Sequence, residues 1–210
     1  MSSKRHSILP AVDRSGPKPP VNFSTSLTIS DNAVLLGIHS ITMQAETVIH
    51  PRSRIESSVG SVLVGRRCIV QERVHIGAPP DNRDKGAGGV SLGDYVLIEA
   101  GSVIEAGGTE IGEGSIIQVG SKVGSGAKIG KVRALRNLGR KAEADANQNC
   151  TVSHLSVIAN GDVLPDNTVV YSNGTRRTDK RGTPELRKLS MVKQIAMLKK
   201  MIPSNQDKFR

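Results

Sequence analysis

Residues 92–130 read LGDYVLIEAGSVIEAGGTEIGEGSIIQVGSKVGSGAKIG, and this stretch decides the fold. An aliphatic residue returns nearly every six positions along it, at Leu92, Ile98, Ile104, Ile111, Ile117, Val123 and Ile129. A helix repeats about every 3.6 residues and a simple strand every two, so neither produces this period. A parallel β-solenoid does, because each side of a three-sided coil contributes one inward aliphatic residue.

The same period extends over most of the chain. It begins at Ile29 and ends at Val170, and three inward positions per coil predict about six to seven coils. A small residue such as Cys68 commonly lies two positions before the aliphatic one, where a narrow bore leaves little room. Glycine often follows the aliphatic residue, as at Gly65 and Gly93. We expect these glycines at coil corners, because glycine adopts turn conformations without steric cost.

The composition agrees with a narrow core. The chain has two Phe, two Tyr and no Trp, and a thin prism filled by Ile, Val and Leu has no space for large rings. Its two cysteines, Cys68 and Cys150, fall on inward small positions, so we expect buried free thiols rather than a disulfide. No apolar run approaches the roughly 18 residues of a membrane span, and no signal peptide is recognised. We therefore expect a cytoplasmic protein without membrane insertion.

The net charge of +10 is unevenly distributed. Residues 1–20, 131–145 and 175–210 are all basic, which leaves an acidic coil body. The chain offers no stacking aromatics and no recognition motif for nucleic acid, so we expect no nucleic-acid partner. The basic segments favour an acidic protein surface as partner, and a purely solubilising role is the alternative.

The period also predicts how the chain is organised. Residues 1–24 contain prolines and little aliphatic content, so we expect an extended basic arm. Residues 25–174 form the predicted β-helix, interrupted by loops at 77–90 and 131–148. Residues 175–210 form a basic linker and a C-terminal amphipathic helix.

The predicted helix has clear boundary signals. Thr183 is a candidate N-cap, Pro184 suits the first helical position, and Pro203 ends the helix. Apolar residues recur at helical spacing between them, and we expect this stripe to cover one side of the coil stack rather than a partner.

Hexapeptide solenoids are known for two activities. One is acyl transfer, with a loop histidine as general base. The other is the γ-carbonic anhydrase reaction, whose metal is held by three histidines. No two histidines of this chain lie within ten residues of each other; they are His6, His39, His50, His75 and His154. We assign His39 to an inward position and His75 to a side face.

These patterns predict no catalytic residue, no cofactor, no metal and a chain that is not an enzyme. Two alternatives remain open. One is a homotrimeric acyltransferase with His75 or His154 as base and the loop at 77–89 over its active site. The other is a γ-carbonic anhydrase-like scaffold.

Several non-repeat segments resemble the dynactin subunit 6 family over about residues 25–205. They match in order and are VLPDNTVVY at 163–171 followed by Arg176-Arg177, MLKKMIPSN at 197–205, TVIHPRSRI at 47–55 and APPDN at 78–82. The resemblance implies a left-handed parallel β-helix, a hand that composition and period cannot reveal. It also implies a non-catalytic, cytoskeleton-associated subunit of the dynactin pointed-end complex, which supports dynein-based transport and cargo attachment.

The resemblance implies particular partners. These are dynactin subunit 5, the pointed-end actin-related protein and other dynactin subunits, and a homo-oligomer is not expected. The open end of the solenoid and the helix are the expected contact regions. The candidate partner-binding residues are Asp162, Pro165, Asp166 and Tyr171 in the last coil and Leu189, Val192 and Ile195 in the helix.

Overall fold

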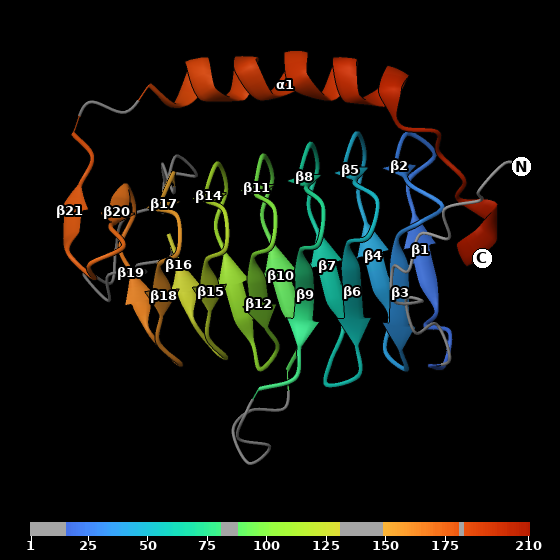
Figure 1. The fold of residues 1–210 in the computed structure, drawn as a ribbon, viewed down its shortest axis with the longest axis horizontal. Helices are drawn as coiled ribbons and strands as arrows, with labels where there is room; N and C mark the ends of the chain where they lie inside the picture. Colours follow the sequence, from blue (N-terminus) through green and yellow to red (C-terminus); the bar gives the residue numbers. More distant parts are fainter. Residues whose placement is uncertain (1–15, 81–87, 131–148, 181–182) are drawn as a thin grey trace, which may run out of the picture.

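The computed structural model describes residues 16–80, 88–130, 149–180 and 183–210. Short strands wind into a three-sided coil, and the sides stack into three sheets that run the length of the molecule (Figure 1). The architecture is a left-handed parallel β-helix with one C-terminal helix, as predicted. Its hand is opposite to the usual right-handed crossover of parallel strands.

Each sheet takes every third strand of the chain, and sheet 2 ends with one additional, antiparallel strand. Sheet 1 consists of β1 (Val21–Phe23), β4 (Ile41–Met43), β7 (Val62–Val64), β10 (Val90–Leu92), β13 (Thr109–Ile111), β16 (Lys128–Ile129) and β19 (Val163–Leu164). Sheet 2 consists of β2 (Thr28–Ile29), β5 (Val48–Ile49), β8 (Ile69–Val70), β11 (Leu97–Ile98), β14 (Ile116–Ile117), β17 (Thr151–Val152), β20 (Thr168–Val170) and β21 (Arg176–Thr178). Sheet 3 consists of β3 (Val34–Gly37), β6 (Arg54–Ser57), β9 (His75–Ala78), β12 (Val103–Glu105), β15 (Lys122–Val123) and β18 (Val157–Ile158).

The core is a column of stacked aliphatic side chains. Parallel register places each inward residue over its counterpart in the next coil, for example Ile49 over Ile29 and Ile98 over Val70. The predicted small positions are buried between these layers, and several of their hydroxyl groups bond to backbone carbonyls; Ser121 Oγ donates to the Ser153 carbonyl at 2.8 Å. Such bonds satisfy polar groups that the dry bore would otherwise leave without a partner. The buried hydroxyl groups of Ser115 and Ser156 have no hydrogen-bond partner among the described residues.

Both cysteines are free and buried, as the period predicts. Burial raises the pKa of the Cys68 thiol to about 12 and that of Cys150 to about 11. Because the thiolate is the reactive form, both residues serve as small core side chains.

Two of the glycines expected at corners act in a different way, whereas Gly130 has the left-handed backbone expected of a turn. Gly65 and Gly93 have no left-handed backbone angles; instead, a Cβ on Gly65 would lie 2.4 Å from the Gly93 carbonyl oxygen. These glycines therefore allow neighbouring coils to approach closely. Several left-handed corners carry side chains instead, including Glu46, Arg67 and Tyr95.

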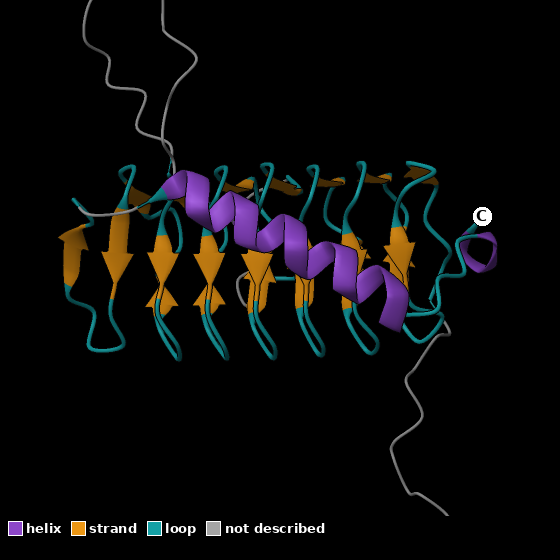
Figure 2. Cartoon of the chain, turned by 90° about the horizontal axis from the view of Figure 1, so that it is seen from above, coloured by secondary structure: helices purple, strands orange, loops and turns teal. Residues whose placement is uncertain are grey.

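Helix α1 (Pro184–Met201) lies along sheet 2 and runs back from the C-terminal coils toward the N-terminal end (Figures 1 and 2). Thr183 occupies the N-cap position as predicted, although its side chain makes no capping hydrogen bond. Met191, Ile195 and Ile202 are buried against Val48 and Ile69, so the helix covers its own coil as expected.

The chain end is tied to the first coils. Ser30 and Ser204 form an antiparallel bridge, and a short 3₁₀ turn, η1 (Asp207–Phe209), follows. β1 lies inside the segment expected to be an arm, so the first coil begins before residue 25. Residues 1–15, the tip of the first loop (81–87) and the segment 131–148 lie outside the described residues.

Candidate functional site

Sheet 3 presents a histidine–carboxylate pair on its outer face. His75 begins β9, and Glu56 projects from the neighbouring strand β6. His75 Nε2 lies 3.1 Å from Glu56 Oε2. Arg54 Nη2 lies 3.0 Å from that same oxygen, and Ser58 Oγ donates to Oε1 at 2.9 Å. The carboxylate is therefore held by three side chains at once.

Burial and hydrogen bonding set the charge states of this pair. Burial alone would raise the pKa of Glu56, but hydrogen bonds from Ser58 and His75 and the charge of Arg54 lower it overall. Burial lowers the pKa of His75, against the upward influence of Glu56. At neutral pH the pair is a carboxylate beside a neutral imidazole.

The carboxylate also selects the tautomer of His75. An ionised carboxylate only accepts hydrogen bonds, so Nε2 of His75 carries the proton and Nδ1 keeps its lone pair. Across the described residues, no hydrogen bond occupies Nδ1. The His75 side chain is 26% exposed and that of Glu56 is 11% exposed. The arrangement provides an oriented, accessible base on a rigid strand.

The other histidines that the structure describes lack such a partner. His39 is exposed, so the inward position assigned to it from the sequence is wrong. His50 has a buried Nε2 without a hydrogen-bond partner among the described residues, and burial lowers its pKa. His154 is exposed at a corner of the coil, and His6 lies outside the described residues.

Metal ligands do not gather in the part of the chain that the structure describes. No group of three or more His, Cys, Asp or Glu side chains there could hold a metal ion. In the same ranges, no helix is long and apolar enough to cross a membrane.

The candidate partner-binding residues of the last coil have different environments. Asp162 is paired with Arg176, whose Nη1 lies 3.1 Å from its Oδ1. The Pro165 carbonyl accepts from Thr168 Oγ1 at 2.6 Å, and Tyr171 is exposed. Asp166 is partly buried, and burial raises its pKa.

The three helix candidates are divided between the faces of α1. Ile195 is buried against the chain's own sheet 2, whereas Leu189 and Val192 are exposed. Ile195 thus contributes to attachment of the helix. A partner role for any of the seven candidates stays a prediction.

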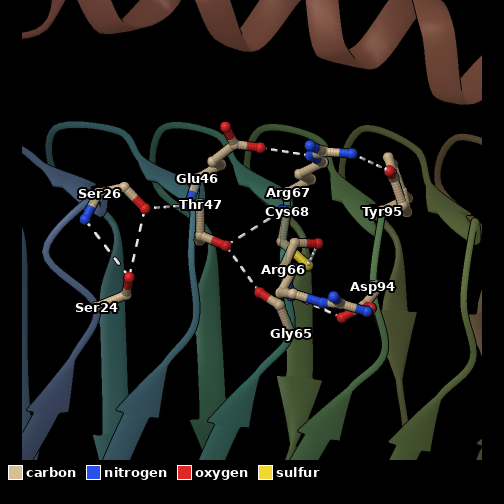
Figure 3. A network of polar contacts seen from close by, with 10 residues as sticks. All are labelled: Ser24, Ser26, Glu46, Thr47, Gly65, Arg66, Arg67, Cys68, Asp94 and Tyr95. Carbon is tan, nitrogen blue, oxygen red and sulfur yellow. Dashed lines mark hydrogen bonds and ion pairs between the residues drawn. The ribbon is translucent and has the colours of Figure 1, made fainter.

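A row of polar side chains, which we call the corner ladder, lies beneath α1. It comprises Glu46, Arg67 and Tyr95 from stacked corners of three coils, with Lys188 of α1 (Figure 3 shows the coil residues). Arg67 binds both Glu46 and the Tyr95 hydroxyl, and its guanidinium carbon lies 5.6 Å from the Tyr95 ring centroid. Lys188 Nζ lies 5.5 Å from that ring centroid and 2.8 Å from Glu113 Oε1. These contacts fix the position of the helix along the coil.

Comparison with known proteins supports the fold. No family model matches the sequence, and no curated protein matches it. A hexapeptide transferase family protein from Anaplasma phagocytophilum superposes with a TM-score of 0.65 at 14% identity, covering 88% of this chain and 96% of that chain.

Two other solved structures superpose less closely. A UDP-N-acetylglucosamine acyltransferase from Francisella novicida has a TM-score of 0.42 at 13% identity and covers 86% of each chain. The acetyltransferase domain of PglB from Neisseria gonorrhoeae, in complex with acetyl coenzyme A, has a TM-score of 0.25 at 17% identity. It covers 77% of this chain and 58% of that chain.

These matches correct one expectation from the sequence. The expectation that the chain is not an enzyme is not supported, because the structure that superposes on it with a TM-score of 0.65 is a hexapeptide transferase family protein. At such low identity the likeness establishes the fold alone. The chain therefore has the left-handed β-helix of hexapeptide-repeat proteins.

Proposed function

We propose that this chain is a hexapeptide-type acyltransferase in which His75 is the general base and Glu56 its positioning residue. The observation that carries the proposal is the His75–Glu56 pair on the outer face of sheet 3, with a 3.1 Å contact. The fold match to a hexapeptide transferase family protein supports this reaction class. We expect a homotrimer, in which a neighbouring copy completes the site.

The proposed chemistry is transfer of an acyl group from a thioester to a hydroxyl or amine acceptor. Nδ1 of His75 takes the acceptor proton while the acceptor oxygen or nitrogen attacks the thioester carbonyl carbon. The carbon–sulfur bond of the resulting tetrahedral intermediate then breaks, and the leaving thiolate takes the proton from the imidazolium. Glu56 stabilises the transient imidazolium and keeps Nε2 protonated throughout.

The charge states of the site suit this role. A base must be unprotonated at the working pH, and burial lowers the pKa of His75 and so keeps the imidazole neutral. The rate should therefore be insensitive to pH near neutrality and fall only below about pH 6.5.

The test uses acetyl coenzyme A as donor and a panel of sugar hydroxyl and amine acceptors. Binding is measured by isothermal titration calorimetry, and transfer by the release of free coenzyme A thiol. His75→Gln should reduce thiol release by about 100-fold. The exposed His154→Gln is the matched control and should retain full activity.

Two results would reject the acyltransferase. One is the absence of both acetyl coenzyme A binding and thiol release across the panel. The other is a His75→Gln variant as active as His154→Gln. Native mass tests the expected trimer independently.

A second candidate is the dynactin pointed-end subunit implied by the resemblance. It is favoured by exposed apolar side chains on the last coils, because apolar side chains that gather on a surface indicate a contact with another protein. Leu155 is 68% exposed and Val157 is 70% exposed. Val163 on the adjacent side is also exposed. In this role, dynactin subunit 5 and the pointed-end actin-related protein are the proposed partners.

This candidate is tested by native mass of the chain mixed with dynactin subunit 5. A one-to-one complex that is lost in Leu155→Glu/Val157→Glu, but kept in the sheet 1 control Leu63→Glu, is the expected result. A chain whose mass does not change when the partner is added would reject it.

A further inference from the structure

Helix α1 is apolar on two opposite faces. The inner face packs on sheet 2 through Met191 and Ile195, and Ile202, the C-cap residue, joins the same cluster. The outer face is defined here by four exposed side chains: Leu186 is 63%, Leu189 53%, Met197 65% and Met201 69% exposed. An ordinary surface helix has one apolar stripe facing the core, so the second stripe is left unexplained by the fold.

The four outer side chains lie within about 60° of one line along the helix, and Lys193 and Lys200 lie among them. At about 100° per residue, Met197 lies three turns from Leu186 and almost directly in line with it. Leu189 and Met201 flank that line on either side, and Ile195 lies half a turn away on the inner face. The line extends over most of the helix, which is about 27 Å long. This length is enough for another helix to pack along it.

The charged side chains around this line are positive. Lys193 and Lys200 are exposed beside the outer apolar residues. Within the described ranges, neither lysine forms an ion pair. Glu185 is the single acidic residue of α1, at its first turn. A partner carrying acidic side chains next to an apolar stripe would complement this face.

The surface is also rigid before any partner arrives. Lys188 is held between Tyr95 and Glu113. Arg67 of the corner ladder binds the Tyr95 hydroxyl from a neighbouring coil (Figure 3). At the other end, the Ser30–Ser204 bridge ties the chain to the first coil. Little conformational entropy is therefore lost when a partner binds this face.

We propose that the outer face of α1 is a docking surface for an acidic amphipathic helix of another protein. Leu and Met fill the irregular gaps of a helix–helix contact well, and Met in particular adapts to different neighbours. Helices that lie in a membrane surface typically insert Trp, Phe and Leu deeply. α1 contains no aromatic residue, so a helix fits this face better than a lipid surface.

The probe is a fluorescein-labelled 18-residue helical peptide with a Leu stripe flanked by Glu. Its counterpart has Lys in place of Glu, and vesicles of phosphatidylserine and phosphatidylcholine represent a membrane. Fluorescence anisotropy measures peptide binding to the full chain, and cosedimentation measures vesicle binding. We expect the Glu peptide to bind, and the Lys peptide and the vesicles not to bind.

Substitutions test whether the Glu peptide binds at the outer face of α1. Leu189→Asp/Met197→Asp and Lys193→Glu/Lys200→Glu should each weaken binding of the Glu peptide by about tenfold or more. Leu63→Asp, an exposed apolar residue on sheet 1, is the control and should bind normally. All four variant positions are exposed, and circular dichroism melts confirm that the variants remain folded.

Three results would overturn the proposal. They are absence of binding by the Glu peptide, equal binding by the Glu and Lys peptides, and binding that the four α1 substitutions leave unchanged. Cosedimentation with anionic vesicles that the same substitutions abolish would assign the face to a membrane instead.

Discussion

Sheets 2 and 3 are built from the same repeat, yet their outer faces differ. The outward row of sheet 2 is largely apolar, with Val48, Ile69, Leu97 and Ile116 in successive strands. The matching row of sheet 3 includes Arg54, His75, Val103 and Lys122. α1 covers the first row, whereas the second is open apart from its own ion pairs.

The comparison shows that the inner and outer residues of a coil have separate tasks. The inner aliphatic residue and its small neighbour build the column whatever lies outside. The outward residue, one position earlier, decides whether a side of the prism packs against a helix or stays available for chemistry. Removing apolar area from water stabilises the covered side by about 25 cal/mol per Å².

The strongest test of this difference places the same charge on both sheets. Ile69→Asp buries a carboxylate under α1 and should lower the free energy of unfolding by at least about 3 kcal/mol. Val103→Asp on sheet 3 should change it by less than about 1 kcal/mol. Urea denaturation followed by circular dichroism measures both. Equal losses would mean that the two faces are energetically alike.

The second test separates function from stability on sheet 3. His75→Gln should reduce thiol release from acetyl coenzyme A by about 100-fold, while the free energy of unfolding changes by less than about 1.5 kcal/mol. A parallel loss of folding and activity would assign His75 a structural role instead. The kinetic assay and a urea melt on one preparation decide between them.

A smaller effect is expected at the corner ladder. Tyr95→Phe keeps the ring beside Lys188 but removes the hydroxyl that binds Arg67, so the free energy of unfolding should fall by about 1 kcal/mol or less. The exposed Tyr171→Phe is the matched control and should have no measurable effect. If Tyr95→Phe behaves like this control, the Arg67 contact does not contribute to helix attachment.

The smallest expected effect is the change in stability that follows protonation of His75. Burial lowers the pKa of His75 in the folded state below the 6.5 of a free side chain. The unfolded chain therefore binds this proton more readily, and stability is lost as the pH falls from 6.5 through the lowered folded-state pKa. Because Glu56 acts to raise the pKa of His75, Glu56→Gln should lower it further. Site-resolved NMR titration of the imidazole follows this shift, and an upward shift would contradict it.

Much of the fold could be predicted because the period of six acts locally. The inward aliphatic residues, the small positions beside them, both cysteines and the C-terminal helix are where the sequence places them. The turn conformation predicted for Gly65 was wrong, because the residues of a single repeat do not show a close contact between neighbouring coils. The covered sheet could also have been found, since Val48, Ile69 and Leu97 are apolar at outward positions.

The candidate site was harder to predict. The period predicts a side-face position for His75 but does not connect it with Glu56. The two are 19 residues apart and meet on adjacent strands only after the chain completes a coil. The coils of this chain differ in length, so a fixed offset in the sequence does not identify such neighbours.

The sequence by itself determined the β-helix, its dry aliphatic column and the presence of a C-terminal helix. These depend on short-range patterns, in which every residue of a repeat has one inward or outward direction. Only the tertiary structure decided which sheet the helix covers, which face of the helix stays exposed and which carboxylate meets His75. Each of these depends on contacts between residues at least a full coil apart, and the stacking of coils, rather than any local preference, brings those residues together.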